Sequence, residues 1–307
     1  MSALKITEQV YSSFVQKGYV ARIVSIDHLT DLAKEMDERY SHGLFDNTFY
    51  KERLNYFVYR KPQGISNLQS IIITSAPQPQ KIVTFHKDGK AYPLVIPPTY
   101  SADTDSKVKQ VLSDTLGQEG YQLYSALLPQ KLLAARSGLV TYGRNNITYT
   151  ETAGSFHRLN VFLSDLPVTE DIWIESQLME LCYQCTACIK KCPTGAISSD
   201  RFLLRAEKCL TFHNERNAEF PDWIDSTWHN CLIGCMECQL CCPVNKEFFQ
   251  WYEQSEQFTS KETESILRGV PRNQLPDSVI KKLENIYLLD DMELIPRNLS
   301  VLLSRYR

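Results

Sequence analysis

The stretch CYQCTACIKKCP at residues 182–193 decides how this chain is interpreted. Its four cysteines, Cys182, Cys185, Cys188 and Cys192, follow the C-x2-C-x2-C-x3-C-P spacing of bacterial two-cluster ferredoxins. Gaps of two residues let one tight loop wrap three thiolates around an iron–sulfur cube, while loop amides donate hydrogen bonds to its sulfurs. The fourth cysteine then faces a neighbouring cube, so the motif predicts half of a two-cluster module.

A second motif, GCMECQLCCP at residues 234–243, again ends with a proline after its last ligating cysteine. Cys209, in EKCLTF, stands upstream in place of the missing cysteine. Because the last cysteine of each motif serves the other cube, we expect the ligation to be crossed. The sequence predicts two 4Fe-4S clusters, one on Cys182, Cys185, Cys188 and Cys242, and the other on Cys192, Cys209, Cys235 and Cys238.

All ten cysteines lie between Cys182 and Cys242, whereas a disulfide framework would spread its bridges along a secreted chain. Structural zinc is an alternative because pairs of C-x2-C also build zinc sites, but zinc ribbons do not need the x3-C-P ending found twice here. A bare ferredoxin would not need the long segment that precedes the cysteines. Cys231 and Cys241 are left over as packing residues or reserve thiols. His213 and His229 are expected to bind no iron, because eight cysteines leave no vacancy.

Composition predicts a globular chain without a general polyanion-binding surface. The 307 residues are 43% hydrophobic and 22% charged, with a net charge of −3. A nucleic-acid role would therefore need a local patch. The N-terminal residues show no signal-peptide pattern, and no run of about 18 apolar residues occurs. We expect a cytoplasmic protein without a membrane segment.

The residues before the cysteines are expected to form mixed α and β structure. Apolar spacing predicts helices over 29–40 and 105–116, and Ile71–Ile73 predicts a strand. Two further strands flank Asp88-Gly89, a hairpin turn signal, and no nucleotide-binding glycine loop is found. Additional expected elements are a strand at 121–127, a helix ending near Gly138, a capping box at Thr259 and Glu262, and an amphipathic helix from Pro276-Asp277 through Leu289.

The segment from Lys131 to Val168 resembles the corresponding stretch of epoxyqueuosine reductases, cobalamin-dependent enzymes of queuosine biosynthesis, and more distantly the corrinoid reductive dehalogenases. The matching residues are Arg136-Ser137-Gly138-Leu139, Gly143-Arg144-Asn145, Gly154-Ser155, Leu163-Ser164-Asp165-Leu166, the cluster motifs through Asn245, and an echo at Pro296-Arg297-Asn298.

This resemblance implies an α+β fold with a nitroreductase-like cobalamin-binding domain at 1–172. A bacterial-ferredoxin-like two-cluster domain at 173–250 and a short helical C-terminal cover at 251–307 are expected to follow. In such an arrangement the clusters would reduce cobalt of the corrinoid to a nucleophilic state. The residues expected to hold cobalamin are Gly143, Arg144, Asn145, Asn146, Gly154, Ser155 and His157; an ordinary polar loop and a hydrogen-bonded histidine are the alternatives.

The family's catalytic aspartate aligns with Tyr124. A tyrosine acid is also found in the resembling dehalogenases, so Tyr124 is the candidate proton donor, although a phenol has an unperturbed pKa of about 10. The alternative is a strand tyrosine half buried in the sheet.

The function predicted from these points is a cobalamin-dependent iron–sulfur reductase of an organic substrate. Alternatives are a redox activator of a partner corrinoid protein and a truncated epoxyqueuosine reductase acting on tRNA. Chain length and net charge weigh against the tRNA substrate. A ferredoxin or flavodoxin is the expected electron donor, with Lys190 and Lys191 as a docking spot or simply a solvated pair.

Overall fold

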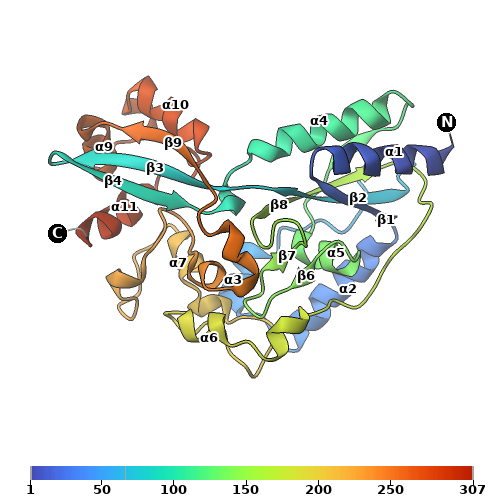
Figure 1. Ribbon diagram of the computed structural model, residues 1–307, viewed down its shortest axis with the longest axis horizontal. Helices are drawn as coiled ribbons and strands as arrows, with labels where there is room; N and C mark the ends of the chain where they lie inside the picture. Colours follow the sequence, from blue (N-terminus) through green and yellow to red (C-terminus); the bar gives the residue numbers. More distant parts are fainter. Residues whose placement is uncertain (1, 66, 306–307) are drawn as a thin grey trace. The chain divides into compact units, whose positions relative to one another are not determined.

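The chain folds into two compact units, as seen in a computed structural model that describes residues 2–65 and 67–305 (Figure 1). The division differs from the predicted boundaries after residues 172 and 250, because one early hairpin belongs with the C-terminal part of the chain. Unit 1 comprises Met1–Gln78 and Asp103–Cys185, and unit 2 comprises Pro79–Ala102 and Thr186–Arg307.

Unit 1 is built on an antiparallel sheet whose strand order is β1-β2-β8-β5. Every residue of β2 from Ser70 to Ala76 is buried, which explains why Ile71–Ile73 reads as an unbroken apolar run. The predicted strand at 121–127 is shorter than expected, with only three residues. The strands are β1 (Val20–Ser25), β2 (Ser70–Pro77), β8 (His157–Ser164) and β5 (Leu123–Ser125).

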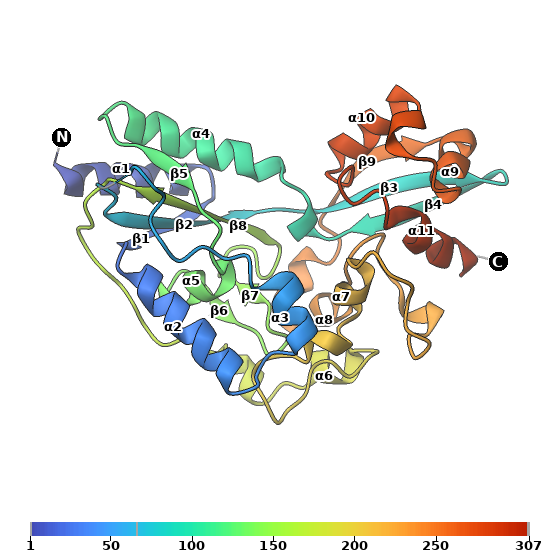
Figure 2. The same ribbon diagram turned by 180° about the vertical axis from the view of Figure 1, so that it is seen from behind.

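Helices cover both faces of this sheet. Helices α1 and α4 pack on one face, where Val10 and Leu112 meet Ile72 in a common core. Helices α2 and α5 lie on the opposite side, as Figure 2 shows. The predicted helices at 29–40, at 105–116 and before Gly138 are confirmed. Unit 1 also contains a short ribbon; its further elements are α1 (Ala3–Gln16), α2 (His28–Ser41), α3 (Asn47–Arg53), α4 (Asp103–Gly117), α5 (Gln130–Arg136), β6 (Thr141–Tyr142), β7 (Thr148–Tyr149) and η2 (Glu180–Tyr183).

Unit 2 contains a second sheet with strand order β4-β3-β9. Strands β3 (Gln80–Lys87) and β4 (Lys90–Ile96) form the predicted hairpin, and positive φ angles at Asp88 and Gly89 confirm its turn. Strand β9 (Tyr252–Phe258) lies parallel to β3, with the Phe85 and Phe258 rings stacked 4.7 Å apart. The segment from 251 onward is therefore not purely helical, which corrects the prediction.

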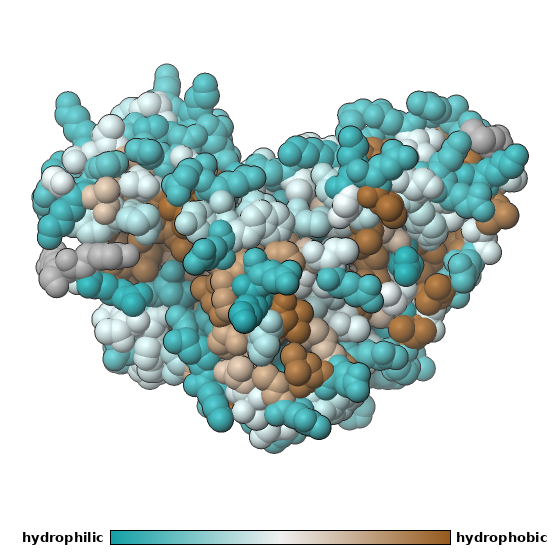
Figure 3. Space-filling view, in the orientation of Figure 1, coloured by the Kyte–Doolittle hydropathy of each residue, from teal (hydrophilic) through white to brown (hydrophobic). Residues whose placement is uncertain are grey.

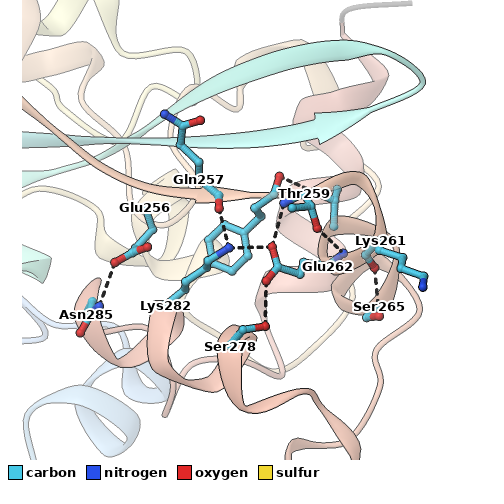
Figure 4. Close-up of polar contacts among 11 residues, drawn as sticks. Glu256, Gln257, Thr259, Lys261, Glu262, Ser265, Ser278, Lys282 and Asn285 are labelled. Carbon is cyan, nitrogen blue, oxygen red and sulfur yellow. Dashed lines mark hydrogen bonds and ion pairs between the residues drawn. The ribbon is translucent and has the colours of Figure 1, made fainter.

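Helices α9 (Ser260–Leu267), α10 (Asp277–Asn285) and α11 (Ile295–Ser304) complete the core of unit 2. The capping box of Thr259 and Glu262 is confirmed. Glu262 also accepts hydrogen bonds from Ser278 and Lys282, at 2.9 and 2.7 Å, and so ties α9 to α10 (Figure 4). The amphipathic helix ends earlier than predicted, at Asn285.

The cysteine region of unit 2 consists of short helices and turns, as ligand loops around a cofactor require. Among the described residues, no helix is long and apolar enough to cross a membrane. The short elements of unit 2 are η1 (Pro98–Tyr100), α6 (Ala187–Lys191), η3 (Ala206–Lys208), α7 (Leu210–Asn214), η4 (Ser226–Trp228), α8 (Glu237–Leu240), η5 (Pro243–Phe248) and η6 (Arg272–Gln274).

Candidate iron–sulfur centre

The thiols of unit 2 gather around Cys238. This residue lies on α8, which packs against α6, the helix that carries Cys188. Burial raises the pKa of the Cys238 thiol well above its usual range, and the neighbouring sulfurs of Cys235, Cys209, Cys192 and Cys188 raise it further. The structure thus brings together the four predicted ligands of one cluster, with a ligand of the other beside them.

Burial also raises the pKa of the Cys209 thiol, and it raises that of Cys235 to about 12. These thiols are protonated without metal, so cluster assembly must release their protons. In the part of the chain that the structure describes, no three His, Cys, Asp or Glu side chains converge as the ligands of a single ion do. A cube of four irons spreads its ligands more widely than one ion does, and cysteine thiolates are its usual ligands, so it is the chemistry of this cysteine set that fits a cluster.

Asn230 fixes the start of the second motif. Its amide nitrogen donates to the Cys235 sulfur at 3.2 Å, and its carbonyl oxygen accepts from the Met236 N–H at 2.9 Å. The buried Cys231 thiol donates to the same oxygen at 3.1 Å. A donor that points at a ligating sulfur stabilises the thiolate and tunes the cluster. Cys231 thereby supports Asn230 through its own hydrogen bond.

The turn before Cys235 is closed against a tyrosine. Gly234 has a φ of +72°, and a Cβ built on it would lie 2.6 Å from the Tyr100 hydroxyl oxygen. That hydroxyl donates to Glu215, while the Asn214 side chain donates to the Gly234 carbonyl at 2.7 Å. The glycine is therefore required both by its backbone conformation and by the close approach of Tyr100.

Helix α11 holds the same region from the C-terminal side. The Arg297 guanidinium donates to carbonyls of the turn after α7, including that of His213 at 3.1 Å. The Asn298 side chain donates to the carbonyls of Asn214 and Leu232, at 3.0 and 3.1 Å. Two segments that flank predicted ligands are thus joined through one buried asparagine. The family-like tripeptide Pro296-Arg297-Asn298 therefore has a structural role in this chain.

The two histidines near this region have other partners. The ring nitrogen Nε2 of His213 lies 2.9 Å from the Glu207 carbonyl oxygen. Burial lowers the pKa of His229 to about 4, and the nearby charges of Arg297 and Arg305 lower it as well. His229 is therefore neutral at physiological pH.

The first two cysteines of the motif at residues 182–193, Cys182 and Cys185, lie in unit 1. Cys182 is buried within η2, and Cys185 follows the turn. The Arg144 guanidinium holds this turn through two hydrogen bonds, in which its Nε and Nη2 atoms donate to the Cys182 carbonyl oxygen at 3.2 and 2.9 Å. Arg144 thus supports a predicted cluster ligand and places a positive charge beside it, while its predicted contact with cobalamin stays a prediction.

The other residues predicted to hold cobalamin lie close together in unit 1, but their polar groups are engaged within the protein. The Asn145 amide donates to the Tyr149 hydroxyl at 2.8 Å. His157 is buried between the Ser75 hydroxyl at 2.8 Å and the Thr148 carbonyl at 2.9 Å, and burial lowers its pKa. Their role in holding cobalamin stays a prediction.

The two glycines of this set have structural reasons of their own. A Cβ on Gly143 would lie 2.5 Å from both the Asn145 oxygen and the Tyr149 ring. Gly154, with φ of 53°, closes a turn in which it exchanges backbone hydrogen bonds with Thr150. Ser155 is buried, and the Asn146 carbonyl accepts from the Lys131 ammonium at 3.2 Å.

Tyr124 lies on β5, half buried, opposite Leu163 of β8. This placement is compatible with both interpretations of the residue, as a proton donor or as a strand tyrosine.

The supporting residues Tyr100, Asn230 and Asn214 were not identified from the sequence. Each contacts the cysteine region through a side chain that carries no spacing signal. Arg297 and Asn298 were noticed as part of the family-like tripeptide. Their hydrogen-bond partners lie some 80 residues earlier in the chain, so the sequence did not predict these contacts.

Comparisons with known proteins place these features in a family context. Residues 181–245 match the model of the 4Fe-4S double cluster binding domain, which confirms the predicted two-cluster module. The chain is 33% identical to the epoxyqueuosine reductase of Aliivibrio fischeri over 144 residues, which cover 46% of this chain and 38% of that protein. It is 27% identical to the Cellulophaga algicola epoxyqueuosine reductase over 186 residues, covering 57% and 59%. The matched segments thus span less than two thirds of these relatives.

Solved structures show the same fold. The epoxyqueuosine reductase of Streptococcus thermophilus superposes with a TM-score of 0.67 at 17% identity, over 99% of this chain and 81% of that one. An epoxyqueuosine reductase solved with an epoxyqueuosine-modified tRNA stem loop gives a TM-score of 0.70 at 18% identity, over 99% and 82%. The resemblance to epoxyqueuosine reductases is therefore confirmed in sequence and in fold. The nitroreductase-like character of unit 1 stays a prediction.

These comparisons correct the predicted function. The prediction of a cobalamin-dependent reductase of an organic substrate is overturned, because the relatives are named epoxyqueuosine reductase and one solved structure holds an epoxyqueuosine-modified tRNA stem loop. The net charge of −3, which weighed against a tRNA substrate, is a sum over the whole chain and does not reveal a local basic surface. The alternative of an epoxyqueuosine reductase acting on tRNA is the better supported one.

Proposed function

We propose that this chain, which is similar to epoxyqueuosine reductases in sequence and in fold, is an iron–sulfur oxidoreductase that reduces an epoxide on a tRNA nucleoside. The observation that carries the proposal is the group of thiols around Cys238, within a segment that matches double-cluster domains. Two clusters fit the reaction, because removal of an epoxide oxygen as water consumes two electrons and two protons, and each cluster delivers one electron at a time.

The ligands are assigned in the crossed arrangement. Cys182, Cys185, Cys188 and Cys242 hold one cluster, and Cys192, Cys209, Cys235 and Cys238 hold the other. One hydrogen-bond donor lies beside each set of cysteines. Arg144 donates to the Cys182 carbonyl, and Asn230 donates to the Cys235 sulfur.

Tyr124 is the proposed proton donor for the departing epoxide oxygen. It stands where the family resemblance places the catalytic acid, and it is only partly exposed. Cobalamin stays a prediction of the sequence resemblance, which the family model and the relatives' names do not support. No step of the proposal passes through it.

Electrons are proposed to enter from a ferredoxin or flavodoxin near α6. Lys190 and Lys191 are exposed on this helix, and Lys191 lies 3.1 Å from Glu237. On the face shown in Figure 3, apolar side chains gather around α6. Exposed lysines beside a redox centre are typical of a surface that docks an acidic redox protein.

The test is reduction of epoxyqueuosine in tRNA by anaerobically reconstituted protein with a chemical reductant, followed by mass spectrometry of the released nucleosides. Cys238→Ala is expected to abolish the reaction. Cys241→Ala is the matched control, because its thiol lies in the same loop, donates to the Cys238 carbonyl at 3.6 Å and belongs to neither assigned ligand set. Unchanged epoxyqueuosine in the presence of fully loaded wild-type protein would rule the proposal out.

A further inference from the structure

One segment of unit 1 combines aromatic and basic residues without joining the core. Between α2 and β2, none of residues 42–65 is fully buried. Within it, the aromatic segment, defined as residues 45–61, contains six rings: Phe45, Phe49, Tyr50, Tyr56, Phe57 and Tyr59. Aromatic side chains normally fill cores. Six partly exposed rings in 17 residues therefore require another explanation.

Five of these rings form two connected groups. Tyr50 stacks on Tyr40 of α2 with centroids 3.9 Å apart, and Phe45 lies 6.1 Å from Tyr50. Phe57 lies 4.7 Å from Tyr56 and 6.4 Å from Tyr59. The Tyr56 side chain is 54% exposed. The contacts hold these rings in place, and Tyr56 is still more than half exposed.

Basic residues alternate with these rings. The aromatic segment contains four, Lys51, Arg53, Arg60 and Lys61, against two acidic residues. One of the acids, Asp46, is occupied as the N-cap of α3, where it accepts from the Phe49 N–H at 2.9 Å. The segment is thus locally positive within a chain whose net charge is −3. It is the kind of local patch that a nucleic-acid role needs.

The segment is tied to the strand that carries the proposed acid. The Val58 N–H donates to the Leu127 carbonyl at 2.9 Å, three residues beyond Tyr124. The side chains of Val58 and Leu127 are both exposed, at 43% and 60%. A ligand lying on the aromatic segment would therefore also meet the end of β5.

We propose that the aromatic segment is the surface on which the unpaired loop bases of a tRNA stack, with Lys51 and Arg60 neutralising the adjacent phosphates. This inference rests on the proposed function and identifies where its substrate is held. Exposed rings bind bases that are not already stacked in a helix, so the segment selects loops over stems. Interleaved cations supply the salt-dependent part of the binding.

The test measures binding of a fluorescent anticodon stem loop to the full chain by anisotropy. Tyr56→Ala is expected to weaken binding by about 5- to 100-fold through loss of one stacking partner, whereas Tyr56→Phe retains the ring and the affinity. Arg60→Gln is expected to lower the slope of log K against log salt by about 0.7. Matched controls are Tyr252→Ala, an exposed tyrosine of β9, and Lys34→Gln, an exposed lysine of α2; both should bind as wild type.

The outcomes separate this inference from the proposed function. If Tyr56→Ala and Arg60→Gln bind the stem loop like wild type while epoxide reduction on tRNA proceeds, the surface assignment is overturned and the function stands. If the variants lose binding but wild type leaves epoxyqueuosine unchanged, the surface holds and the proposed activity fails. Dimerisation of the free chain that Tyr56→Ala abolishes, without any RNA binding, would assign the surface to a second copy instead.

Discussion

At the scale of single residues, the candidate site depends on side chains that touch the cysteine loops without being ligands. Tyr100, Asn230 and Arg144 each contact a loop that carries a predicted ligand, and each does so through a directed hydrogen bond or a close approach. Such contacts fix ligand geometry, so their removal is expected to impair the clusters more than the fold.

Gly234→Ala is expected to prevent assembly of the cluster assigned to Cys235. The new Cβ would meet the Tyr100 hydroxyl at 2.6 Å, and a residue with a side chain is strained at φ of +72°. Iron content after reconstitution should fall from about eight to about four per chain. Gly269→Ala is the control, because φ is +63° there and the nearest atom is 4.0 Å away. Equal iron contents in both variants would contradict the argument.

Arg144 is expected to stabilise the cluster on Cys182 in two ways, by holding its turn and by placing a positive charge nearby. Arg144→Gln should lower the reduction potential of that cluster and speed its loss in air, because the charge and the paired hydrogen bonds both disappear. Arg144→Lys separates the two effects by retaining the charge alone. Redox titration followed by electron paramagnetic resonance measures the result; a potential unchanged in Arg144→Gln would remove the electrostatic role.

At the scale of elements, the structure shows which signals are local. The hairpin at Asp88-Gly89 and the capping box at Thr259 are set by neighbours in the chain, and both were predicted. Strand β9, YEQSEQF, was not, because its polar residues alternate with no apolar face. It becomes a strand only through its parallel pairing with β3, which lies about 170 residues earlier. The contacts of Asn298 and Tyr100 were hidden for the same reason.

The hydrogen bonds of Glu262, which join α9 to α10, should make the stability of unit 2 sensitive to acid. Burial by itself raises the pKa of Glu262, but hydrogen bonds from Lys282, the Thr259 backbone and Ser278 outweigh it and lower the pKa to about 2 from an ordinary value of 4.5 (Figure 4). A carboxyl group whose pKa is lowered on folding stabilises the protein above its unfolded pKa. This contribution should be complete above pH 4.5 and disappear as the pH falls towards 2.

Glu262→Gln should therefore reduce the free energy of unfolding by about 2 kcal/mol at pH 6, since it breaks a partly buried, charge-assisted pair. The difference between variant and wild type should shrink as the pH drops from 5 to 3. Glu264→Gln serves as the control, because Glu264 is an exposed partner of Arg268 and should change stability little. Urea unfolding at each pH measures the effect, and a pH-independent difference would contradict the mechanism.

At the scale of the whole molecule, the cysteine spacing predicted the two-cluster module. The ligand loops are short, so the distances between their cysteines are fixed by residues that are close together in the sequence. The destination of the electrons was predicted wrongly, and the surface that we propose for the substrate, residues 45–61, has an aromatic and basic pattern without fixed spacing. Net charge and chain length, the properties used instead, describe the whole chain and not the patch.

Crossed ligation is predicted from the spacing of the two motifs, and paired substitutions can test it. If Cys188 and Cys242 serve the same cluster, Cys188→Ala combined with Cys242→Ala leaves the other intact, at about four irons per chain. Cys188→Ala combined with Cys192→Ala then removes a ligand from each and leaves almost none. Ligation within each motif predicts the reverse pattern. Iron and sulfide analysis of the two double variants separates these arrangements, and Cys241→Ala, which retains all eight proposed ligands, should keep about eight irons.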